Sequence, residues 1–232
     1  MSSELPPGLA RLWDTEERPP RRTLSVDGIV EAAIALADEE GLEAVSMGRV
    51  AKALGVTPMS LYRHVENKDE LLALMLDRAA GEAPADTAGD WRARTERWCR
   101  ELRVAIGRHP WILNLPLSRA PLGPRRTAWM EAGFAALSDT PLSEADKAAT
   151  VLTLNGLIIS DLRFGREAAM AAPADADAFA RTVAAVAGDR FPALSRAMAA
   201  GIFGDEDDPD AVFAYGLERL LDGVEAQLRS GG

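Results

Sequence analysis

The chain is poor in the residues that build most catalytic and metal sites. Its 232 residues include one cysteine, Cys99, and two histidines, His64 and His109. A single cysteine excludes an intramolecular disulfide, and we expect Cys99 to fill a buried apolar position rather than to act as a redox switch. No HExxH, CxxC or glycine-rich phosphate loop occurs, and neither histidine is near a candidate nucleophile in the sequence. The sequence therefore predicts no enzyme, no metal site and no cofactor.

Long apolar runs are also missing. The longest mostly apolar stretch without charge, residues 148–160, is too short to span a bilayer. The N-terminus carries Glu4, Asp14, Glu16 and Glu17, whereas a signal peptide has basic and then apolar residues. We therefore expect a soluble, cytoplasmic protein without a membrane partner.

Positive charge is scarce as well. The net charge is -10, and residues 21–68 hold six basic groups against seven acidic ones. Four of these acids lie between Asp38 and Glu43, at the end of the first predicted helix (residues 25–41). Any binding of phosphate groups must then depend on local charge, so we expect modest non-specific affinity for nucleic acid.

Helical periodicity is what the sequence does contain. Apolar residues make up 47% of the chain, which supports a substantial core, and no strand-like alternation is found. We expect an all-α protein. Helices are predicted over residues 25–41, 46–54, 57–65, 68–81, 90–108, 125–137, 143–166, 179–186, 189–201 and 209–228, with a short segment at 111–115.

One segment in the N-terminal third has the residue order of two short helices joined by a tight turn. Ser46 is a good N-cap, and Gly55 allows a chain reversal that residues with side chains resist. Thr57 and Pro58 restart a helix, because a hydroxyl can cap it and proline is tolerated at its first position. A third capped helix follows from Asn67. This order is typical of a helix-turn-helix that binds DNA.

The second of these short helices has a distinctive outer face. Leu61 and Val65 can pack inward, which leaves the polar and basic residues facing out. Such a cluster is often only a solvated face, but hydroxyls, an aromatic ring, Arg and His on a short helix also suit the major groove. The outward residues are Thr57, Met59, Ser60, Tyr62, Arg63 and His64.

These residues carry a resemblance to a known family. Residues 25–76, above all LGVTPMSLYRHVENKDELL (54–72), resemble the N-terminal domain of the TetR family of bacterial transcriptional regulators. A weaker resemblance, through RHPW (108–111) and the helix pattern, extends to tetracycline-repressor-like C-terminal domains. It implies a three-helix DNA-binding domain over residues 21–69. The larger remainder, residues 70–232, would bind a ligand and form a dimer, with residues 70–81 as a connector helix.

The resemblance also implies roles for single positions. The residues after the turn would meet base edges or nearby phosphates, Tyr62 and His64 would contact the DNA backbone, and Lys68 would hold a phosphate at a helix start. The tetracycline repressor itself has a guanine-reading arginine where this chain has Gly48, so the operator should differ, and Arg63 is a candidate replacement contact. The predicted DNA-binding residues are Arg49, Thr57, Pro58, Met59, Ser60, Tyr62, Arg63, His64 and Lys68.

The segment before the first helix has two interpretations. Residues 1–20, with prolines near both ends, are expected to form a flexible leader. Arg21 and Arg22 either form a basic arm that lies against DNA, as in relatives, or belong to that leader.

A dimer is expected because one helix-turn-helix contacts too few base pairs for a specific operator. The resemblance implies a four-helix bundle made from residues 143–166 and 209–228 of both subunits. Their apolar stripes could instead face the subunit's own core. The residues expected at the interface are Val151, Leu154, Ile158, Leu217, Leu221 and Val224.

The large second domain is expected to sense a small molecule, as the resemblance implies. Aromatic walls with a few polar groups are what small-molecule pockets require, although each residue alone could equally be core or surface. Composition favours an apolar or aromatic effector. The candidate ligand-binding residues are Trp98, Leu102, His109, Trp111, Leu115, Trp129, Phe134, Asn155, Ile159 and Arg163.

Together these features predict a sequence-specific DNA-binding regulator. We expect a homodimeric repressor that a small-molecule effector releases from a palindromic, double-stranded DNA operator. The alternative is a helical protein-interaction adaptor that does not bind DNA, which the acidic net charge favours.

Overall fold

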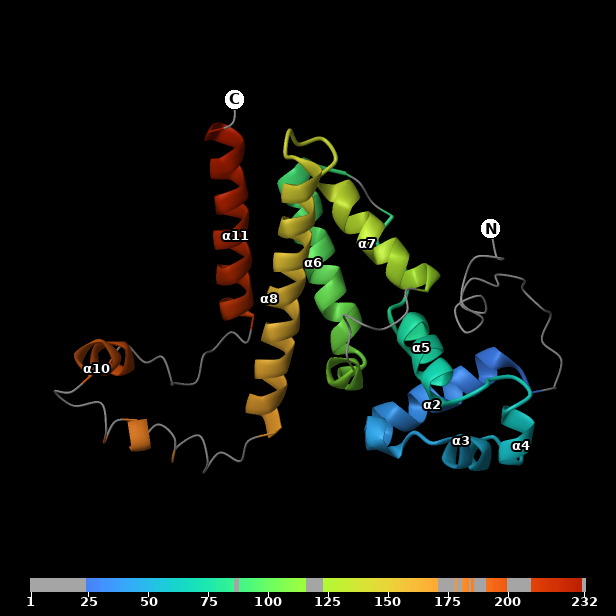
Figure 1. The fold of residues 1–232 in the computed structure, drawn as a ribbon. Coiled ribbons are helices and arrows are strands. Elements are labelled where there is room, and N and C mark those ends of the chain that lie inside the picture. The colour runs from blue at the N-terminus through green and yellow to red at the C-terminus, as the bar shows by residue number, and fades with distance from the viewer. Residues whose placement is uncertain are drawn as a thin grey trace.

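The computed structural model describes residues 24–85, 88–115, 123–170, 178, 181–183, 185, 191–199 and 210–230. These residues contain helices and connecting segments but no β-strand, which confirms the all-α fold (Figure 1). The predicted leader and the predicted arm, Arg21 and Arg22, lie outside the described residues. The principal helices are α2 (Val26–Glu40), η2 (Leu42–Ala44), α3 (Met47–Ala53), α4 (Pro58–Leu61), α5 (Lys68–Ala79), α6 (Trp91–Gly107), η3 (Pro110–Asn114), α7 (Pro124–Ala136), α8 (Glu144–Met170), α10 (Pro192–Ala199) and α11 (Ala211–Ser230).

Side-chain caps fix the starts of the N-terminal helices where the sequence predicts them. The Ser25 hydroxyl accepts the Gly28 N–H at 3.1 Å, and the Ser46 hydroxyl accepts the Arg49 N–H at 3.3 Å. Gly55 has φ 67°, a conformation that side chains disfavour, and it forms the turn after α3. Helices α2, α3 and α4 then share one small core, whose fully buried members include Ile29, Ala33, Val45, Val50, Leu61 and Val65.

The second helix of the motif differs from the prediction in two ways. Helix α4 has four residues, Pro58–Leu61, and so ends earlier than expected. The Thr57 hydroxyl does not cap a backbone N–H. It lies 3.0 Å from the Ser60 hydroxyl instead. One of the two hydroxyls donates to the other, so the outer surface of α4 carries a hydrogen-bonded pair of hydroxyls.

Helix α5 joins the two halves of the molecule. Asn67 caps it by accepting the Glu70 N–H at 2.8 Å, and the Glu70 carboxylate accepts the Glu66 N–H at 2.5 Å. The helix packs on α2 at one side and on α7 at the other (Figure 1). It is therefore buried almost all round, as a connector between two bodies has to be. Its buried residues are Glu70, Leu71, Ala73, Leu74, Met75, Leu76, Asp77 and Ala79.

The larger domain is built from α6, α7, α8 and α11. Helix α6 packs on α7 and α8, and α11 lies alongside α8. Close packing is clearest between α6 and α7, because a Cβ on Gly133 would lie 2.9 Å from the Trp98 ring. Cys99 is fully buried, and burial raises the pKa of its thiol to about 12. Cys99 thus fills the apolar position expected of it.

The apolar stripes of α8 and α11 face the subunit's own core. Val151, Leu154, Ile158, Leu217 and Leu221 are all buried within the protomer, and Val224 is half-buried. The prediction that these five buried residues lie at a dimer interface is therefore wrong. An amphipathic stripe shows that a helix face is covered, but not which chain covers it.

The predicted helices near the C-terminal end are described only in part. Half of residues 179–186 lie outside the described residues. The expected helix over 189–201 appears as the shorter α10. None of the helices that the structure describes is long and apolar enough to cross a membrane.

Candidate DNA-binding surface and sensing domain

The outer face of α4 carries most of the predicted DNA-binding residues. Met59 and Tyr62 are large side chains with 70% and 49% of their surface exposed. Thr57, Pro58 and Arg63 are exposed beside them. Both side chains are exposed to solvent in this chain, so both can contact the surface of a partner molecule. An exposed apolar side chain, a phenol and two hydroxyls on one short helix can contact thymine methyl groups and phosphates.

Lys68 lies at the first position of α5, directly after the capping residue Asn67. Its side chain is exposed, and it forms no ion pair with any residue that the structure describes. The first turn of a helix presents backbone N–H groups and a positive dipole end. A lysine at this place can therefore bind a phosphate together with the helix start.

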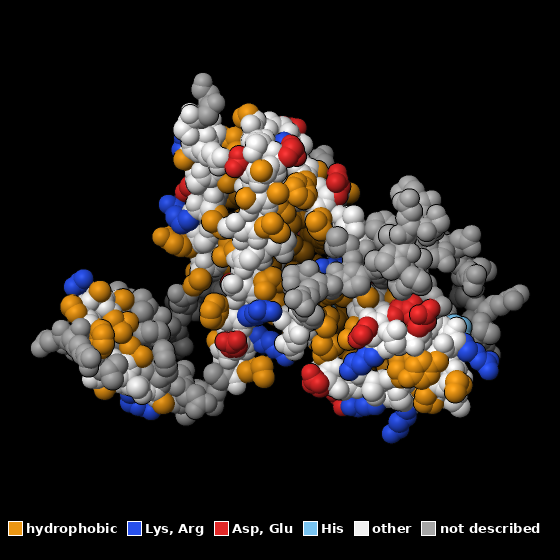
Figure 2. All heavy atoms as spheres, viewed as in Figure 1, with side chains coloured by type: hydrophobic (Ala, Val, Ile, Leu, Met, Phe, Trp, Pro, Cys, Tyr) orange, Lys and Arg blue, Asp and Glu red, His pale blue; other side chains and the backbone are white. Residues whose placement is uncertain are grey.

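Arg49 already has a partner within the chain. Its guanidinium forms an ion pair with Glu40 at the end of α2, and this hydrogen bond lowers the pKa of Glu40. Both side chains are 47% exposed, and exposed ion pairs contribute little stability. A DNA phosphate can compete with Glu40 for Arg49. On the face drawn in Figure 2, the Lys and Arg side chains of this domain lie apart, with acidic and apolar groups between them.

Two further positions near this surface, His64 and Gly48, differ in how accessible they are. His64 is half-buried and already interacts within the chain, so it is less available than its exposed neighbours. Gly48, in the first turn of α3, is exposed, and a Cβ there would meet nothing within 4 Å. A side chain at position 48 would therefore lie at the open surface of α3.

The predicted ligand-binding tryptophans use their polar atoms within the protein. The indole N–H of Trp98 donates to the Trp129 carbonyl at 3.0 Å, and that of Trp129 donates to the Ala80 carbonyl at 2.8 Å. The indole N–H of Trp111 donates to the Asp38 carboxylate at 2.7 Å. All three rings are buried. Their contribution to a pocket would thus be an apolar wall.

The remaining predicted ligand contacts are spread over several elements. Leu102 is buried, whereas Leu115, Phe134, Asn155 and Ile159 are half-buried. Arg163 donates to the Leu113 carbonyl at 2.8 Å, and His109 hydrogen-bonds to Asp38. The structure does not gather these residues around one cavity among the residues it describes, and their ligand role stays a prediction.

A hollow of about 420 Å³ lies where the end of α5 meets α6 and α7. Its size falls in the range of about 300–1,000 Å³ that is usual for small-molecule sites. Of the predicted ligand residues only Trp129 lines it. Helical periodicity did not point to the other residues that line the hollow, because those on α6 share their face with charged side chains. They include Ala80, Glu82, Arg100, Val104 and Arg108.

A buried acid, Asp77, lies between the connector helix and the start of α7. The Asp77 carboxylate, on the connector helix α5, accepts the backbone N–H of Arg126 at 3.0 Å at the start of α7. Burial raises the pKa of Asp77, although these backbone bonds and nearby arginines act in the other direction. The signal was present in the sequence as a single acid inside the apolar run LLALMLDRA.

Comparison with known proteins matches both parts of the chain. Residues 29–75 match the model of the bacterial regulatory proteins of the tetR family, and residues 83–228 match the model of tetracyclin repressor-like C-terminal domains. The HTH-type transcriptional repressor DrrR1 of Streptomyces coeruleorubidus is 37% identical over 238 residues, covering 97% of this chain and 87% of DrrR1. The chain belongs to the TetR family.

Solved structures agree with this assignment. Apo ActR from Streptomyces coelicolor has a TM-score of 0.79 and 29% identity, covering 92% of this chain and 100% of that chain. ActR in complex with actinorhodin has a TM-score of 0.76, at 29% identity over 89% of this chain and 99% of that chain. BioQ with its double-stranded DNA operator has a TM-score of 0.53 and 29% identity, over 60% of this chain and 86% of that chain.

These findings define the functional class. The chain is a DNA-binding transcriptional repressor of the ligand-responsive type, with a helix-turn-helix at its N-terminal end and a helical sensing domain behind it. The adaptor without DNA binding is not favoured.

Proposed function

We propose that the protein represses transcription as a homodimer on a palindromic operator and leaves the DNA when a small molecule binds its larger domain. We assign DNA binding to residues 21–69 and sensing and dimerisation to residues 70–232, with α5 as the connector. The observation that carries this proposal is the exposed face of α4, with Met59 and Tyr62 unburied beside a lysine at the start of α5.

The dimer surface that we propose is the outer face of α8 and α11, opposite the buried stripes. Leu152 and Tyr215 are 70% and 67% exposed, which is unusual for apolar and aromatic side chains of this size. Gly156 on α8 and Gly223 on α11 are also exposed, with open space around a Cβ on either. Small residues between large ones let the helices of a second subunit approach closely. We therefore propose that α8 and α11 of the two subunits form a four-helix bundle.

For the effector we propose the hollow between α5, α6 and α7. Val104 and Trp129 provide apolar surface there, and the charged lining residues are Glu82, Arg100, Glu101 and Arg108. An aromatic compound with polar substituents fits such a lining. ActR, which resembles this chain in fold, has been solved in complex with actinorhodin, and this supports a small-molecule effector for this chain.

The proposed activity involves no catalysis. The relatives are transcriptional regulators. We infer that the protein acts in the cytoplasm, where its DNA target is found.

The testing experiment is a gel shift with purified full-length protein. DNA fragments bound from a random pool are sequenced, and the recovered site is used in a salt titration. We expect a two-fold symmetric site bound by one dimer, with affinity that falls steeply as salt rises. Recovery of no preferred sequence would reject the proposal. The effector site is tested with aromatic compounds that release the DNA, which Val104→Trp should abolish by filling the hollow.

A further inference from the structure

A polar contact joins the DNA-binding domain to the sensing domain outside the connector helix. Asp38, near the end of α2, accepts the indole N–H of Trp111 at 2.7 Å. The same carboxylate lies 2.9 Å and 3.1 Å from Nδ1 of His109. A carboxylate can only accept, so the imidazole donates. Residues more than seventy positions apart in the sequence therefore meet at one carboxylate.

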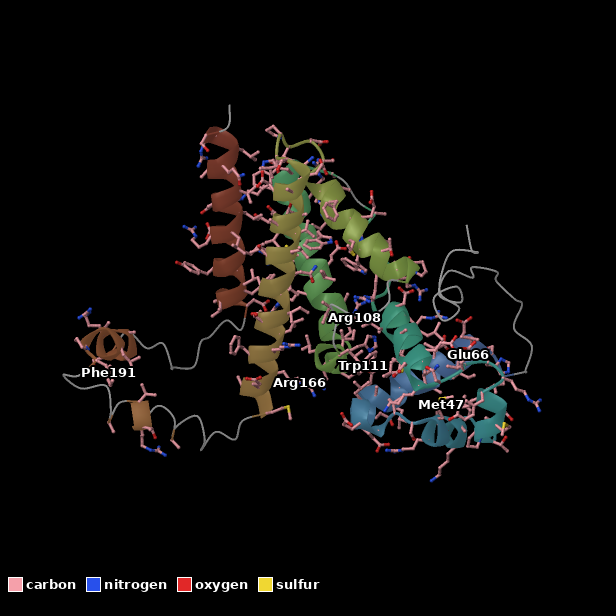
Figure 3. The ribbon with its side chains drawn as sticks, viewed as in Figure 1. Met47, Glu66, Arg108, Trp111, Arg166 and Phe191 are labelled. Carbon is pink, nitrogen blue, oxygen red and sulfur yellow. The ribbon has the colours of Figure 1, made fainter. Side chains whose placement is uncertain are left out.

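The segment that reaches Asp38 is itself fixed to α8. Arg163 donates to the Leu113 carbonyl and Arg166 to the Pro110 carbonyl, each at 2.8 Å. Both acceptors belong to η3, the short helix that contains Trp111. In Figure 3, Trp111 lies where the lower end of α6 meets the DNA-binding domain, and Arg166 extends from α8. The contacts thus run from α2 through η3 to α8, the helix that carries the proposed dimer surface.

This route is separate from the one through the connector. Helix α5 is joined to α2 by an ion pair between Arg78 and Asp27, and to α7 by Asp77. A body held at one place can pivot about it, whereas a second attachment away from the first fixes its orientation. The Asp38 contact is that second attachment.

Loss of the hydrogen bond between Trp111 and Asp38 costs free energy. Trp111 is buried, with 2% of its surface exposed, and a buried indole N–H without an acceptor loses the hydrogen bond it would make with water. Asp38 supplies that acceptor only when the two domains stand at the orientation seen here. Rotation of the DNA-binding domain away from η3 has to break the Trp111 and His109 bonds together.

We infer that Asp38 is a positioning residue for operator recognition. Its carboxylate sets the angle of the DNA-binding domain to the dimer core, and through that angle the separation of the two recognition helices. The inference rests on the proposed dimeric repressor. Half-sites must lie about one helical turn of DNA apart, so a fixed angle makes binding depend on the length of the spacer between them.

The experiment compares full-length variants on DNA sites that differ only in spacer length. The site recovered with the wild-type protein is made with its spacer unchanged, lengthened or shortened by a single base pair. The variants are Asp38→Ala, Trp111→Phe and, as the matched control, Glu39→Gln. Glu39 is the exposed acid next to Asp38, and it has no ion pair or hydrogen bond from its side chain to the residues that the structure describes.

We expect wild type and Glu39→Gln to prefer the natural spacer by about tenfold or more, which corresponds to about 1.4 kcal/mol. Asp38→Ala should bind that site several-fold more weakly and prefer it over the altered ones by less than about threefold, the change expected when a coupling free energy is lost. Trp111→Phe keeps the buried ring and removes only the donor, so it should shift the preference in the same direction even if Asp38→Ala unfolds.

The outcomes separate this inference from the proposed function. If the wild-type protein recovers no preferred DNA, the proposed function fails and the inference falls with it. If wild type shows a spacer preference that Asp38→Ala and Trp111→Phe retain in full, the repressor stands and the positioning role of Asp38 is wrong. An equal loss of affinity on all spacers would also overturn it, since a purely structural role predicts that pattern.

Discussion

The Asp77 carboxylate occupies the space next to the Cα of Gly123: a Cβ on that glycine would lie 2.3 Å from the carboxylate carbon. The two residues belong to different elements, since Asp77 is on the connector α5 and Gly123 is the N-cap position of α7. Glycine permits the close approach, and the carboxylate then accepts backbone N–H groups at the start of α7. A displacement of α7 is therefore passed to the connector.

Gly123→Ala should destabilise the protein by about 2–3 kcal/mol, because the new methyl group overlaps the buried Asp77 and forces it from its hydrogen bonds. Urea unfolding followed by circular dichroism measures this loss. Gly165→Ala is the matched control. Gly165 is exposed within α8 with open space around a Cβ, so alanine there should be neutral or stabilise by up to about 1 kcal/mol. Equal effects of the two changes would contradict the close approach.

Asp77 should also make stability depend on pH. Burial holds the pKa of Asp77 above its ordinary value of 3.8, so the folded state binds a proton more tightly than the unfolded state. The stabilisation from this protonation is complete below the ordinary pKa and is lost as pH rises through the raised one. The stability of wild type relative to Asp77→Asn should therefore fall as pH increases just above 3.8. Urea unfolding at closely spaced pH values measures the difference, and a rise instead would show that the pKa is lowered.

Cys99 should be unreactive in the folded protein. Its pKa of about 12 leaves almost no thiolate at pH 8, and the side chain is fully buried. Because the thiolate is the nucleophile, labelling by iodoacetamide should be at least about a hundredfold slower in the native protein than in urea. Mass spectrometry of timed samples gives both rates. Rapid native labelling would mean that this part of α6 opens readily.

Lys68→Ala and Tyr62→Ala should each lower operator affinity by at least about tenfold, as expected for the loss of a phosphate or backbone contact. Lys68→Ala should also reduce the slope of affinity against salt by about one ion. Gel shifts at several salt concentrations supply both numbers. Arg196→Ala removes an exposed cation from α10, outside the DNA-binding domain, and serves as the control. If the operator is bound equally well by all three variants, the surface of α4 is not the DNA-binding surface.

Leu152→Glu and Tyr215→Glu should convert the dimer to monomers at micromolar concentration, since each places a charge in the proposed apolar interface. Both positions are exposed in the protomer, so the subunit itself should remain folded. Sedimentation velocity measures the mass, and circular dichroism verifies the helices. Dimers that persist in both variants would place the interface elsewhere.

The sequence predicts the local structure of this protein well and its long-range contacts poorly. The caps at Ser25, Ser46 and Asn67 are each formed as expected, because a cap involves residues only three positions apart. The same holds for the left-handed turn at Gly55. The Thr57 hydroxyl is the local exception, since the Ser60 hydroxyl competes for it.

Contacts between distant segments explain most of what the sequence could not predict. The sequence predicts His109 and Trp111 as ligand contacts, because small-molecule pockets require aromatic walls with a few polar groups. Nothing in the sequence near them indicates a partner on α2, and the structure supplies one in Asp38. The apolar stripes of α8 and α11 are ambiguous in the sequence for a related reason. Leu154 and Leu217 give the same helical pattern whether they pack against a second subunit or, as the structure shows, against the core of their own subunit.

The open surface at Gly48 has a practical consequence for regulator design. A side chain can be added there without repacking, because a Cβ would meet nothing within 4 Å. The residue lies in the first turn of α3, while the sensing domain, the connector and the proposed dimer helices lie elsewhere in the chain. A library of variants at this single position should therefore yield repressors that respond to the same small molecule but bind different operator sequences.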